Sequence, residues 1–439
     1  MYNYFLSETD RINAIIAHNA PLTLKELAQK EIERFALSHK RRDMLTGERY
    51  YRGQHDILKR RRTAIGEGGK TVELDNLPNN RVVNNIYKML VDQKVNYLLG
   101  RPISMRCGDK AVSEKLKKVF NREFFRTLKN IGEDALNCGI GWLYVCFDEN
   151  GELKTRRIRP FELIPAWMDS EHTELDYAVR VYDTLRYVGK SERLVTKAEI
   201  YTKEGVRSYV LEGGTLTEEG LLTPYCSADG KSYGFKKIPL IPFKYNSKEL
   251  PLIKNVKGLQ DGLNSLLSDF HNCMEEDVRN TILVIKNYDG EDLGQFRKNL
   301  SAYGAVKVKT VDGSQGGVET LNIEVNADNY KTIIDIFKRA IIENGRGYDA
   351  KDDRLGSNPN QMNILSMYND IDIDANGMET EFSASLEALA DFVADGSGEV
   401  EFVFNRSMIM NESEVIDNIV KSKGLVDDEV LRARHPWVK

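Results

Sequence analysis

The most informative stretch of the sequence is Asn79-Asn-Arg-Val-Val-Asn-Asn-Ile-Tyr-Lys-Met-Leu-Val-Asp-Gln-Lys-Val-Asn-Tyr-Leu-Leu-Gly-Arg-Pro102. Its apolar side chains recur at helical spacing, which predicts a helix over about residues 82–99. Gly100 and Pro102 mark the end of that helix, because glycine commonly follows a helix C-terminus and proline cannot continue a helix. Before it, residues 63–80 contain several glycines and a proline, and we expect a loop there.

Helical periodicity also predicts helices on both sides of this stretch. Thr23-Leu-Lys-Glu26 is a capping-box pattern ahead of an apolar-periodic run. We expect the helices at 256–278 and 327–344 to run antiparallel, with a small α/β insert at their shared tip. The expected helices are at about 113–137, 256–278, 327–344 and 361–394, and the insert has strands near 282–286 and 305–311 and a helix near 293–303.

Between these helices the period changes to that of strands. Gly141–Phe147 and Leu153–Ile158 flank Asp148-Glu-Asn-Gly151, which is a hairpin signal. Residues 140–245 are therefore predicted to form an antiparallel β-rich region inside a largely helical chain, so the fold class is α+β. Further strands are expected at 176–187, 194–202, 207–211, 238–245 and 399–405, and a capped helix at 411–424.

Composition limits the possible functions. The chain has 439 residues, enough for two to four structural units, and 41% of them are hydrophobic. The net charge of −5 argues against a tight grip on duplex DNA, since such proteins are usually basic. No apolar run is long enough to span a bilayer, and the N-terminus has no signal-peptide pattern, so we expect a soluble protein made in a cytoplasm, with no membrane partner.

The residues of common catalytic and metal sites are not arranged as those sites require. The five cysteines are scattered and form no CxxC, so we expect reduced thiols rather than a disulfide framework. No HExxH or GxSxG motif is present, and Gly66-Glu-Gly-Gly-Lys70-Thr71 lacks the first glycine of a phosphate-binding loop. His55-Asp56 is an adjacent histidine–carboxylate pair, and we expect it at the surface. We therefore predict no enzyme activity, no cofactor and no metal.

Two basic runs remain, Arg41-Arg42 and Lys59-Arg-Arg-Arg62. The simpler interpretation is a solvated helix face. The alternative is a patch that faces phosphates, and the sequence leaves both open.

Four stretches of the chain, in order, resemble the portal proteins of tailed phages, in particular the type found in siphophages of Gram-positive bacteria. The first is the most specific: it joins the stretch 79–102 quoted above to Tyr50-Tyr-Arg-Gly-Gln-His-Asp-Ile57. The others are Arg159-Pro-Phe-Glu-Leu-Ile-Pro165, Ile238-Pro-Leu-Ile-Pro-Phe-Lys-Tyr-Asn246 with the helix after it, and Phe402-Val-Phe-Asn-Arg406 with Lys421-Ser-Lys-Gly-Leu-Val-Asp-Asp-Glu429.

The resemblance implies a portal fold and a ring of about twelve subunits around double-stranded DNA. The channel would serve for packaging and ejection at one capsid vertex, so the expected location is the virion, and the host bacterial cytoplasm during assembly. The implied parts are a wing at 1–255, stem helices at 256–281 and 326–346, a clip at 282–325, a tunnel loop at 347–360, a long helix back to the wing at 361–398, and the start of a C-terminal crown at 399–439, which is expected to be truncated because the family usually continues further.

The implied tunnel loop also suits a conduit by its charge. It carries Asp349, Asp352 and Asp353 against the two cations Lys351 and Arg354, for a net charge of −1. DNA would be both attracted and repelled there, and each neutralised phosphate adds affinity through counterion release. We expect sequence-independent contact, because a pore wall need not reach into the grooves. The predicted contact residues are Lys351, Arg354, Asn358 and Asn360.

The resemblance also implies partners. These are the terminase motor and the head-tail adaptor proteins, which meet the clip, and the major capsid and scaffolding proteins. The alternatives to a portal are a non-portal oligomeric scaffold or adaptor of the virion, and a nucleic-acid-processing enzyme of a mobile element. The enzyme would need metal-binding carboxylates or a phosphate loop, and neither pattern is present.

Overall fold

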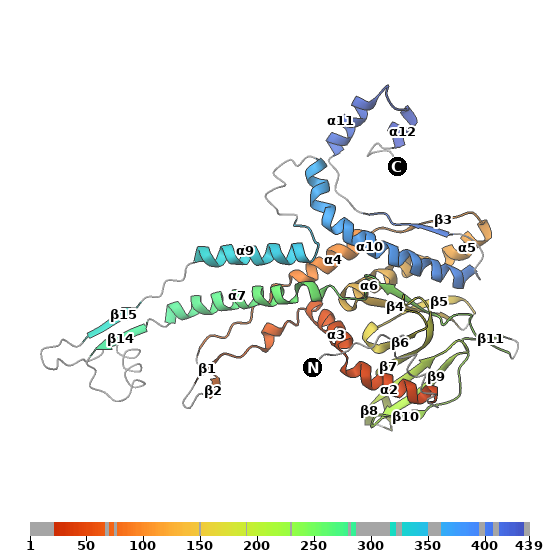
Figure 1. Ribbon diagram of the computed structural model, residues 1–439, viewed down its shortest axis with the longest axis horizontal. Helices are drawn as coiled ribbons and strands as arrows, with labels where there is room; N and C mark the ends of the chain where they lie inside the picture. The colour runs from red at the N-terminus through yellow and green to blue at the C-terminus, as the bar shows by residue number, and fades with distance from the viewer. Residues whose placement is uncertain are drawn as a thin grey trace. The chain divides into compact units, whose positions relative to one another are not determined.

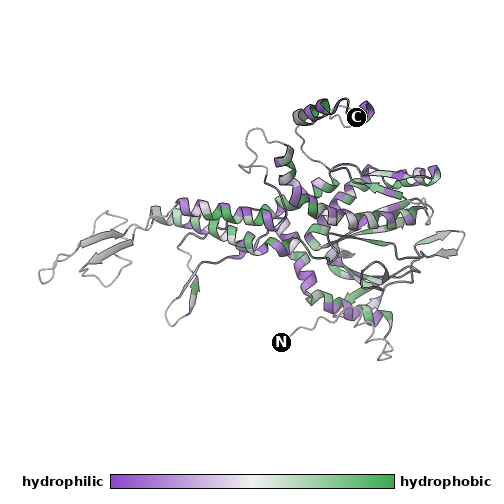
Figure 2. Cartoon of the chain, turned by 45° about the horizontal axis from the view of Figure 1, so that its top comes forward, coloured by the Kyte–Doolittle hydropathy of each residue, from purple (hydrophilic) through white to green (hydrophobic). Residues whose placement is uncertain are grey.

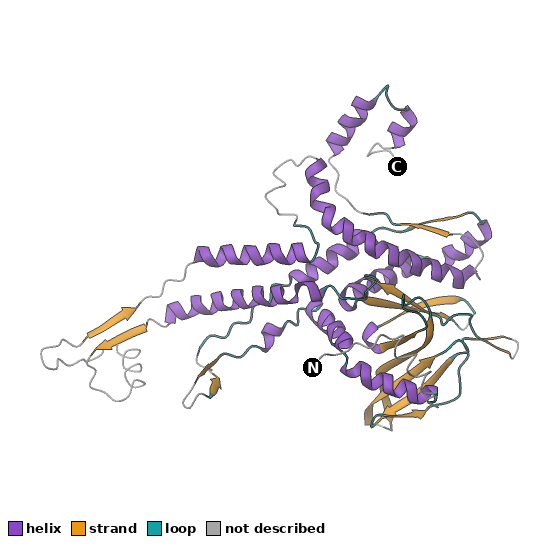
Figure 3. Ribbon diagram, viewed as in Figure 1, coloured by secondary structure: helices purple, strands orange, loops and turns teal. Residues whose placement is uncertain are grey.

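The computed structural model describes residues 22–65, 70–73, 77–148, 151–189, 191–228, 231–279, 282–286, 317–321, 327–349, 361–394, 400–406 and 412–433. These residues form a mixed α+β fold, as Figures 1 and 3 show. The chain divides into two compact units: one comprises residues 1–54, 85–257 and 340–439, and the other comprises 55–84 and 258–339. Among the described residues, no helix is long and apolar enough to cross a membrane.

The first unit begins with two capped helices, α2 (Leu24–Leu37) and α3 (His39–Tyr51). The predicted capping box is confirmed, because Thr23 and Glu26 each accept from the other's backbone amide. Ser38 ends α2 and also caps α3, where its side chain accepts from the amide of Arg41.

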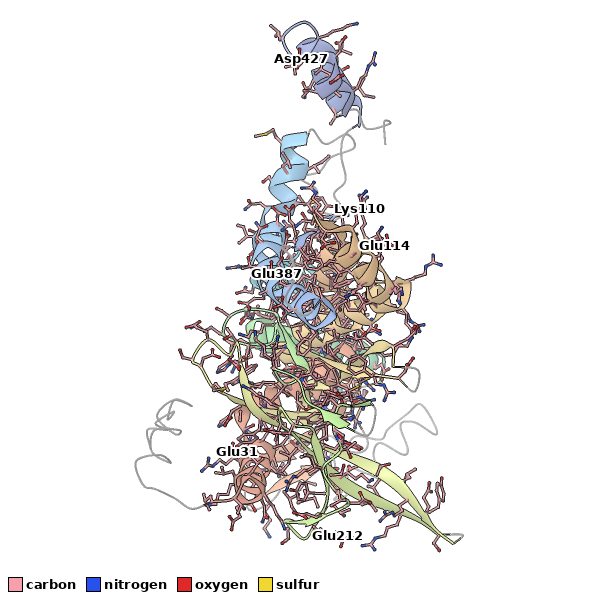
Figure 4. All side chains as sticks on the ribbon, turned by 90° about the vertical axis from the view of Figure 1, so that its right-hand side faces the viewer. Glu31, Lys110, Glu114, Glu212, Glu387 and Asp427 are labelled. Carbon is pink, nitrogen blue, oxygen red and sulfur yellow. The ribbon has the colours of Figure 1, made fainter. Side chains whose placement is uncertain are left out.

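Three helices follow in the same unit: α4 (Ile86–Leu99), α5 (Lys110–Val119) and α6 (Arg122–Cys138). The single helix predicted at 113–137 is wrong, because Asn121 separates α5 from α6. The Asn121 side chain accepts from the amides of Glu123 and Phe124, so it starts a new helix. Figure 4 shows α5, with Lys110 and Glu114, beside α10 (Gln361–Ala394), which carries Glu387.

The predicted antiparallel β-rich region is confirmed as two main sheets. One has the order β13-β4-β5, and the other has the order β10-β9-β8-β7-β6. Trp142 of β4 and Trp167 of β6 stack at 5.8 Å in the core beneath them. The strands are β4 (Ile140–Phe147), β5 (Leu153–Ile158), β6 (Leu163–Trp167), β7 (Leu175–Val188), β8 (Ser191–Tyr201), β9 (Val206–Glu212), β10 (Thr215–Glu218) and β13 (Leu240–Lys244), and a small hairpin pairs β11 (Cys226–Ala228) with β12 (Lys231–Tyr233).

Helix α10 has the bounds that its apolar stripe predicts. Its buried side includes Phe382, which meets Phe243 of β13 edge-to-face at 5.0 Å. Near it, β3 (Ser104–Cys107) pairs with β16 (Val400–Val403), which confirms the strand expected at 399–405. The chain continues into α11 (Glu412–Ser422) and α12 (Asp428–Ala433).

The second unit contains most of α7 (Ile253–Arg279) and α9 (Ala327–Asn344), whose predicted helical state is confirmed. Gly262 lies against Phe337, and Phe270 meets Tyr330 at 5.0 Å, so the two helices run antiparallel, as expected. Figure 2 shows hydrophobic and hydrophilic residues interleaved along both. The strand expected at 282–286, β14 (Ile282–Lys286), pairs with β15 (Gly317–Leu321), while the elements expected at 293–303 and 305–311 lie outside the described residues.

The same unit holds a short helix η1 (Asp56–Lys59) and a hairpin of β1 (Thr63–Ile65) and β2 (Thr71–Glu73). The loop predicted over 63–80 is therefore partly wrong. Thr63, Ile65 and Val72 have β-branched side chains that favour strands, and the glycine-rich stretch between them allows the chain to reverse.

Candidate functional site

The predicted contact residues Lys351, Arg354, Asn358 and Asn360 lie outside the described residues. The structure does describe both ends of the segment that contains them: residues 347–349, which follow α9, and the start of α10. The residues that hold the start of this segment, here called its base, belong to the first unit and form the candidate site.

Gln93 of α4 holds the start of the segment through its side-chain amide. Its Nε2 donates to the carbonyl oxygen of Tyr348 at 2.9 Å, and its Oε1 accepts from the Tyr348 amide at 3.4 Å. The Gln93 side chain thus pairs with both backbone groups of one residue, as a neighbouring strand would. This pairing satisfies backbone groups that have no partner in a helix or sheet.

Two glycines let the backbone pass close to α4. A Cβ on Gly345 would lie 2.5 Å from Leu90 Cδ1, and one on Gly347 would lie 2.2 Å from Leu90 Cδ2. Between them, Arg346 has a φ of 49°, in the left-handed region that non-glycine residues seldom adopt. The carbonyl oxygen of Arg346 accepts from Lys94 Nζ at 3.1 Å, which stabilises this turn.

Lys94 is a buried cation that joins this turn to α10. Its Nζ lies 2.6 Å from Asp374 Oδ2, which also accepts from the Tyr245 hydroxyl at 2.8 Å. Burial lowers the pKa of Lys94, and the charge of Asp374 opposes that shift. Burial and the bond to Asp374 raise the pKa of Tyr245. Removing one partner of such a buried pair costs about 3–5 kcal/mol, so the pair fixes the base of the segment firmly.

Three tyrosines stack beside this network. Tyr368 of α10 packs between Tyr348, at 4.9 Å, and Tyr97 of α4, at 5.8 Å. The Tyr97 hydroxyl donates to Asp372 at 3.0 Å; burial and this bond raise the pKa of Tyr97 to about 12. Arg406, which follows β16, donates to Asp372, Asn376 and Glu379 on the same helix.

An open groove of about 820 Å³ runs along α4 beside these tyrosines. Its lining mixes two cations, one carboxylate and three amides with the aromatic rings. Lys88 and Asp92 form an ion pair at 3.0 Å, so the groove has little net charge. Such a surface can hydrogen-bond to many polar partners without holding a phosphate strongly. The polar lining residues are Asn85, Lys88, Asp92, Gln93, Asn96 and Arg101.

The second unit has its own polar arrangement, which sequence reasoning missed. Gln260, Asn264, Ser268 and Asn272 recur every fourth residue along α7, and all are buried. The amides of residues 80, 82 and 84 donate to Asn272 Oδ1, Ser268 Oγ and Asn264 Oδ1 at 2.7, 2.9 and 3.0 Å. Two residues of extended chain rise about 6.7 Å and four helical residues about 6 Å, so the donors and acceptors stay matched.

His55 completes this ladder. It is buried, and its Nδ1 lies 2.8 Å from Asn264 Nδ2, so the surface position expected for His55 is wrong. Gln260 Nε2 also donates to the Asn84 carbonyl at 2.7 Å. The signal in the sequence was the four-residue spacing of amide and hydroxyl side chains, which the apolar stripe of the same helix obscured.

Among the described residues no three histidine, cysteine, aspartate or glutamate side chains are grouped as metal ligands. The cysteines are free thiols; Cys138 is buried, and burial raises its pKa well above the usual range. The described part of the chain thus has three polar arrangements: the fixed base of the segment after α9, the amide-rich groove along α4, and the side-chain ladder on α7.

Known proteins are similar in sequence to this chain over most of its length. The family model for phage portal proteins of the SPP1 Gp6-like type matches residues 36–439. The portal protein of Bacillus phage SPP1 is 27% identical over 454 aligned residues, covering 99% of this chain and 88% of that protein. The portal protein of Clostridium phage phiCD119 is 27% identical over 416 residues, covering 91% and 90%.

Among solved structures, a chain of the virion of a native gene transfer agent particle covers 80% of this chain and is itself covered to 89%. It is 11% identical with a TM-score of 0.45, and we base no argument on it.

Proposed function

Since the chain belongs to the SPP1 Gp6-like family of phage portal proteins, we propose that about twelve copies form a ring at one capsid vertex. Double-stranded DNA would cross this ring during packaging and ejection. The family match over residues 36–439 is the observation that carries the proposal. The antiparallel contact of α7 with α9 supports it, because paired long helices from each subunit can build a channel wall.

The proposed parts follow the element order. The proposed tunnel loop begins where Gln93 and Lys94 hold Tyr348 and Arg346, so its starting point is fixed. The wing would comprise 1–255, the stem 256–281 and 326–346, the clip 282–325, the tunnel loop 347–360, the helix back to the wing 361–398, and the crown would begin at 399–439.

The clip would dock the terminase motor and later the head-tail adaptor proteins, and the ring as a whole would contact the major capsid and scaffolding proteins. The protein would assemble in the host cytoplasm and remain in the virion. The proposed role is structural, as a conduit and docking platform, without catalysis.

Negative-stain electron microscopy of the purified protein, with native mass measurement, tests this function. We expect rings of about twelve subunits with an open centre wide enough for duplex DNA. A compact closed dimer without a channel would instead indicate a non-portal scaffold or adaptor of the virion.

A further inference from the structure

Helix α10 carries negative charge along its length and no positive charge. Its 34 residues contain seven acidic residues and neither lysine nor arginine. Three of these acids already pair with Lys94 or Arg406 within the subunit. Glu387, labelled in Figure 4, and Asp391 are exposed, and neither forms an ion pair with a described residue. The last third of the helix therefore presents two unpaired carboxylates to solvent.

These two carboxylates lie on one side of the helix. Glu387 and Asp391 are four residues apart, so they occupy neighbouring turns about 6 Å apart along the axis. The core lies elsewhere around the helix, where Leu386 is fully buried. The nearby positions on the acidic side are alanines, with Ala384 exposed and Ala388 half-buried. Their short side chains leave room for a second chain to reach both carboxylates.

Helix α6 carries two cations at the same spacing. Arg122 and Arg126 are exposed, four residues apart, and neither forms an ion pair with a described residue. Leu128, on another side of the helix, is buried in the core. Lys129 continues the basic side, but it donates to Asn96 Oδ1 at 2.7 Å. The two arginines are thus the cations of this side that have no ionic partner in the described part of the chain.

Arginine suits a partner with paired carboxylates. A guanidinium can donate two parallel hydrogen bonds to one carboxylate, which fixes the geometry as well as the charge. One exposed ion pair contributes little, so two adjacent pairs at a matched spacing of about 6 Å are needed to hold two helices in register. Within the described residues of one subunit, no ion pair joins α6 to α10. Both pairs of side chains therefore remain available to another molecule.

We propose that Arg122 and Arg126 of one subunit bind Glu387 and Asp391 in the neighbouring subunit. This rests on the ring proposed above, because a head-to-tail interface that closes needs two different patches on each copy. A second copy fits better than duplex DNA does. DNA at the two arginines would leave the carboxylates of α10 without a partner and would be repelled by nearby acids, whereas a second copy satisfies both patches at once.

Charge reversal and its rescue test this docking on the full-length chain. The basic variant is Arg122→Glu with Arg126→Glu, and the acidic variant is Glu387→Arg with Asp391→Arg. Each variant alone should lower the ring fraction at least about tenfold in roughly 0.1 M salt, where screening is moderate. The four changes together restore opposite charges across the contact. They should return the ring fraction to within about threefold of that of the unaltered protein.

Lys115→Glu with Lys118→Glu is the matched control. Both lysines are exposed on α5, the helix that precedes α6, so this variant reverses the same number of charges close to the arginines. The control should keep the ring fraction within about twofold of that of the unaltered protein. Circular dichroism of every variant separates failure to fold from failure to assemble.

Three results would overturn the docking and leave the ring itself intact. They are normal rings from both reversal variants, no rescue by the four changes together, and an equal loss of rings in the α5 control. Normal rings from the basic variant with loss of salt-dependent binding to duplex DNA would make the arginines a phosphate contact instead. An unaltered chain that forms no ring, either alone or in virions, would overturn the proposed function and the docking with it.

Discussion

Glu249 is a carboxylate held almost out of water between a lysine and a histidine side chain. Its side chain is 3% exposed, Lys40 Nζ lies 2.5 Å from Oε2, and His172 Nδ1 lies 2.6 Å from Oε1. The His172 ring stacks on Trp167 at 4.8 Å. Burial alone would raise the pKa of Glu249, but the bond from His172 and the charge of Lys40 outweigh it and lower that pKa to about 2. One carboxylate thus joins α3, the β6–β7 turn and the loop before α7.

Replacing Glu249 should therefore make stability depend less on pH. A pKa lowered from 4.5 to about 2 stabilises the folded chain fully above pH 4.5, and this contribution is lost as the pH falls towards 2. We expect Glu249→Gln to lower the free energy of unfolding by about 3 kcal/mol at pH 7 and by only about 1 kcal/mol near pH 2.5. Urea unfolding followed by tryptophan fluorescence measures both values.

Glu212→Gln is the matched control. Glu212, at the end of β9 in Figure 4, pairs with Arg193 at 3.2 Å but is 60% exposed. Its loss should change stability by less than about 1 kcal/mol at either pH. An equal loss in the two variants, or a Glu249→Gln effect that does not change with pH, would contradict the role assigned to the buried carboxylate.

At the scale of elements, the polar ladder on α7 should slow the hydrogen exchange of the backbone amides that it binds. The amides of Asn80, Val82 and Asn84 donate to buried side chains, so they should exchange with solvent more slowly than those of Arg81 and Val83. Asn264→Ala should abolish the protection at Asn84 and cost about 1–3 kcal/mol, because it leaves a buried donor unpaired. Hydrogen exchange resolved by residue measures this, with Asn255→Ala, at an exposed position of α7, as control. Uniform exchange rates along residues 80–84 would argue against the ladder.

Substituting each of two glycines of α7 by alanine tests the contact of this helix with α9. A Cβ on Gly262 would meet Phe337 Cε1 at 2.5 Å, whereas one on Gly258 would meet nothing within 4 Å. Gly262→Ala should cost about 1–3 kcal/mol of stability through overpacking. Gly258→Ala should add up to about 1 kcal/mol, since alanine favours the helix. Thermal unfolding of the two variants should shift in opposite directions; a gain for both would mean that the two helices are not in close contact here.

These elements also show what sequence patterns could and could not predict. Helix α10 was predicted to the residue because its apolar stripe is long and regular. The break at Asn121 was missed, since an asparagine cap interrupts a helical period without changing it. Strand β6 was missed because it is short and contains Pro165, which demotes a strand prediction.

The candidate site was predicted less completely, for a different reason. Its base depends on the pairs Lys94–Asp374 and Gln93–Tyr348, whose members lie 280 and 255 residues apart. The local spacing of apolar and polar residues cannot predict such contacts, because only the folded chain brings the partners together. The polar ladder was missed for another reason. In a sequence, polar side chains at helical spacing predict a solvated helix face, although the fold buries these ones.

At the scale of the whole molecule, a conduit must touch DNA without holding it. The chain has a net charge of −5 and the proposed tunnel loop a net charge of −1, so in this proposal phosphates would meet repulsion as well as the cations Lys351 and Arg354. About twelve copies would bring about two dozen such cations to one channel, which supplies weak contacts that form and break as the DNA moves. Contacts with phosphates alone carry no sequence information.

Removing both cations should therefore weaken DNA retention and leave ring assembly unchanged. We expect Lys351→Ala with Arg354→Ala to lower packaged or retained DNA about tenfold, equally for two genomes of different sequence, because each lost phosphate contact lowers affinity through counterion release. DNA protected from nuclease in assembled particles measures retention, and electron microscopy of the same particles checks the ring. Lys115→Ala with Lys118→Ala, on exposed α5, controls for the loss of two charges. Packaging and retention at the level of the unaltered protein would mean that these two side chains do not contact DNA, and the search for the contact would turn to the groove along α4.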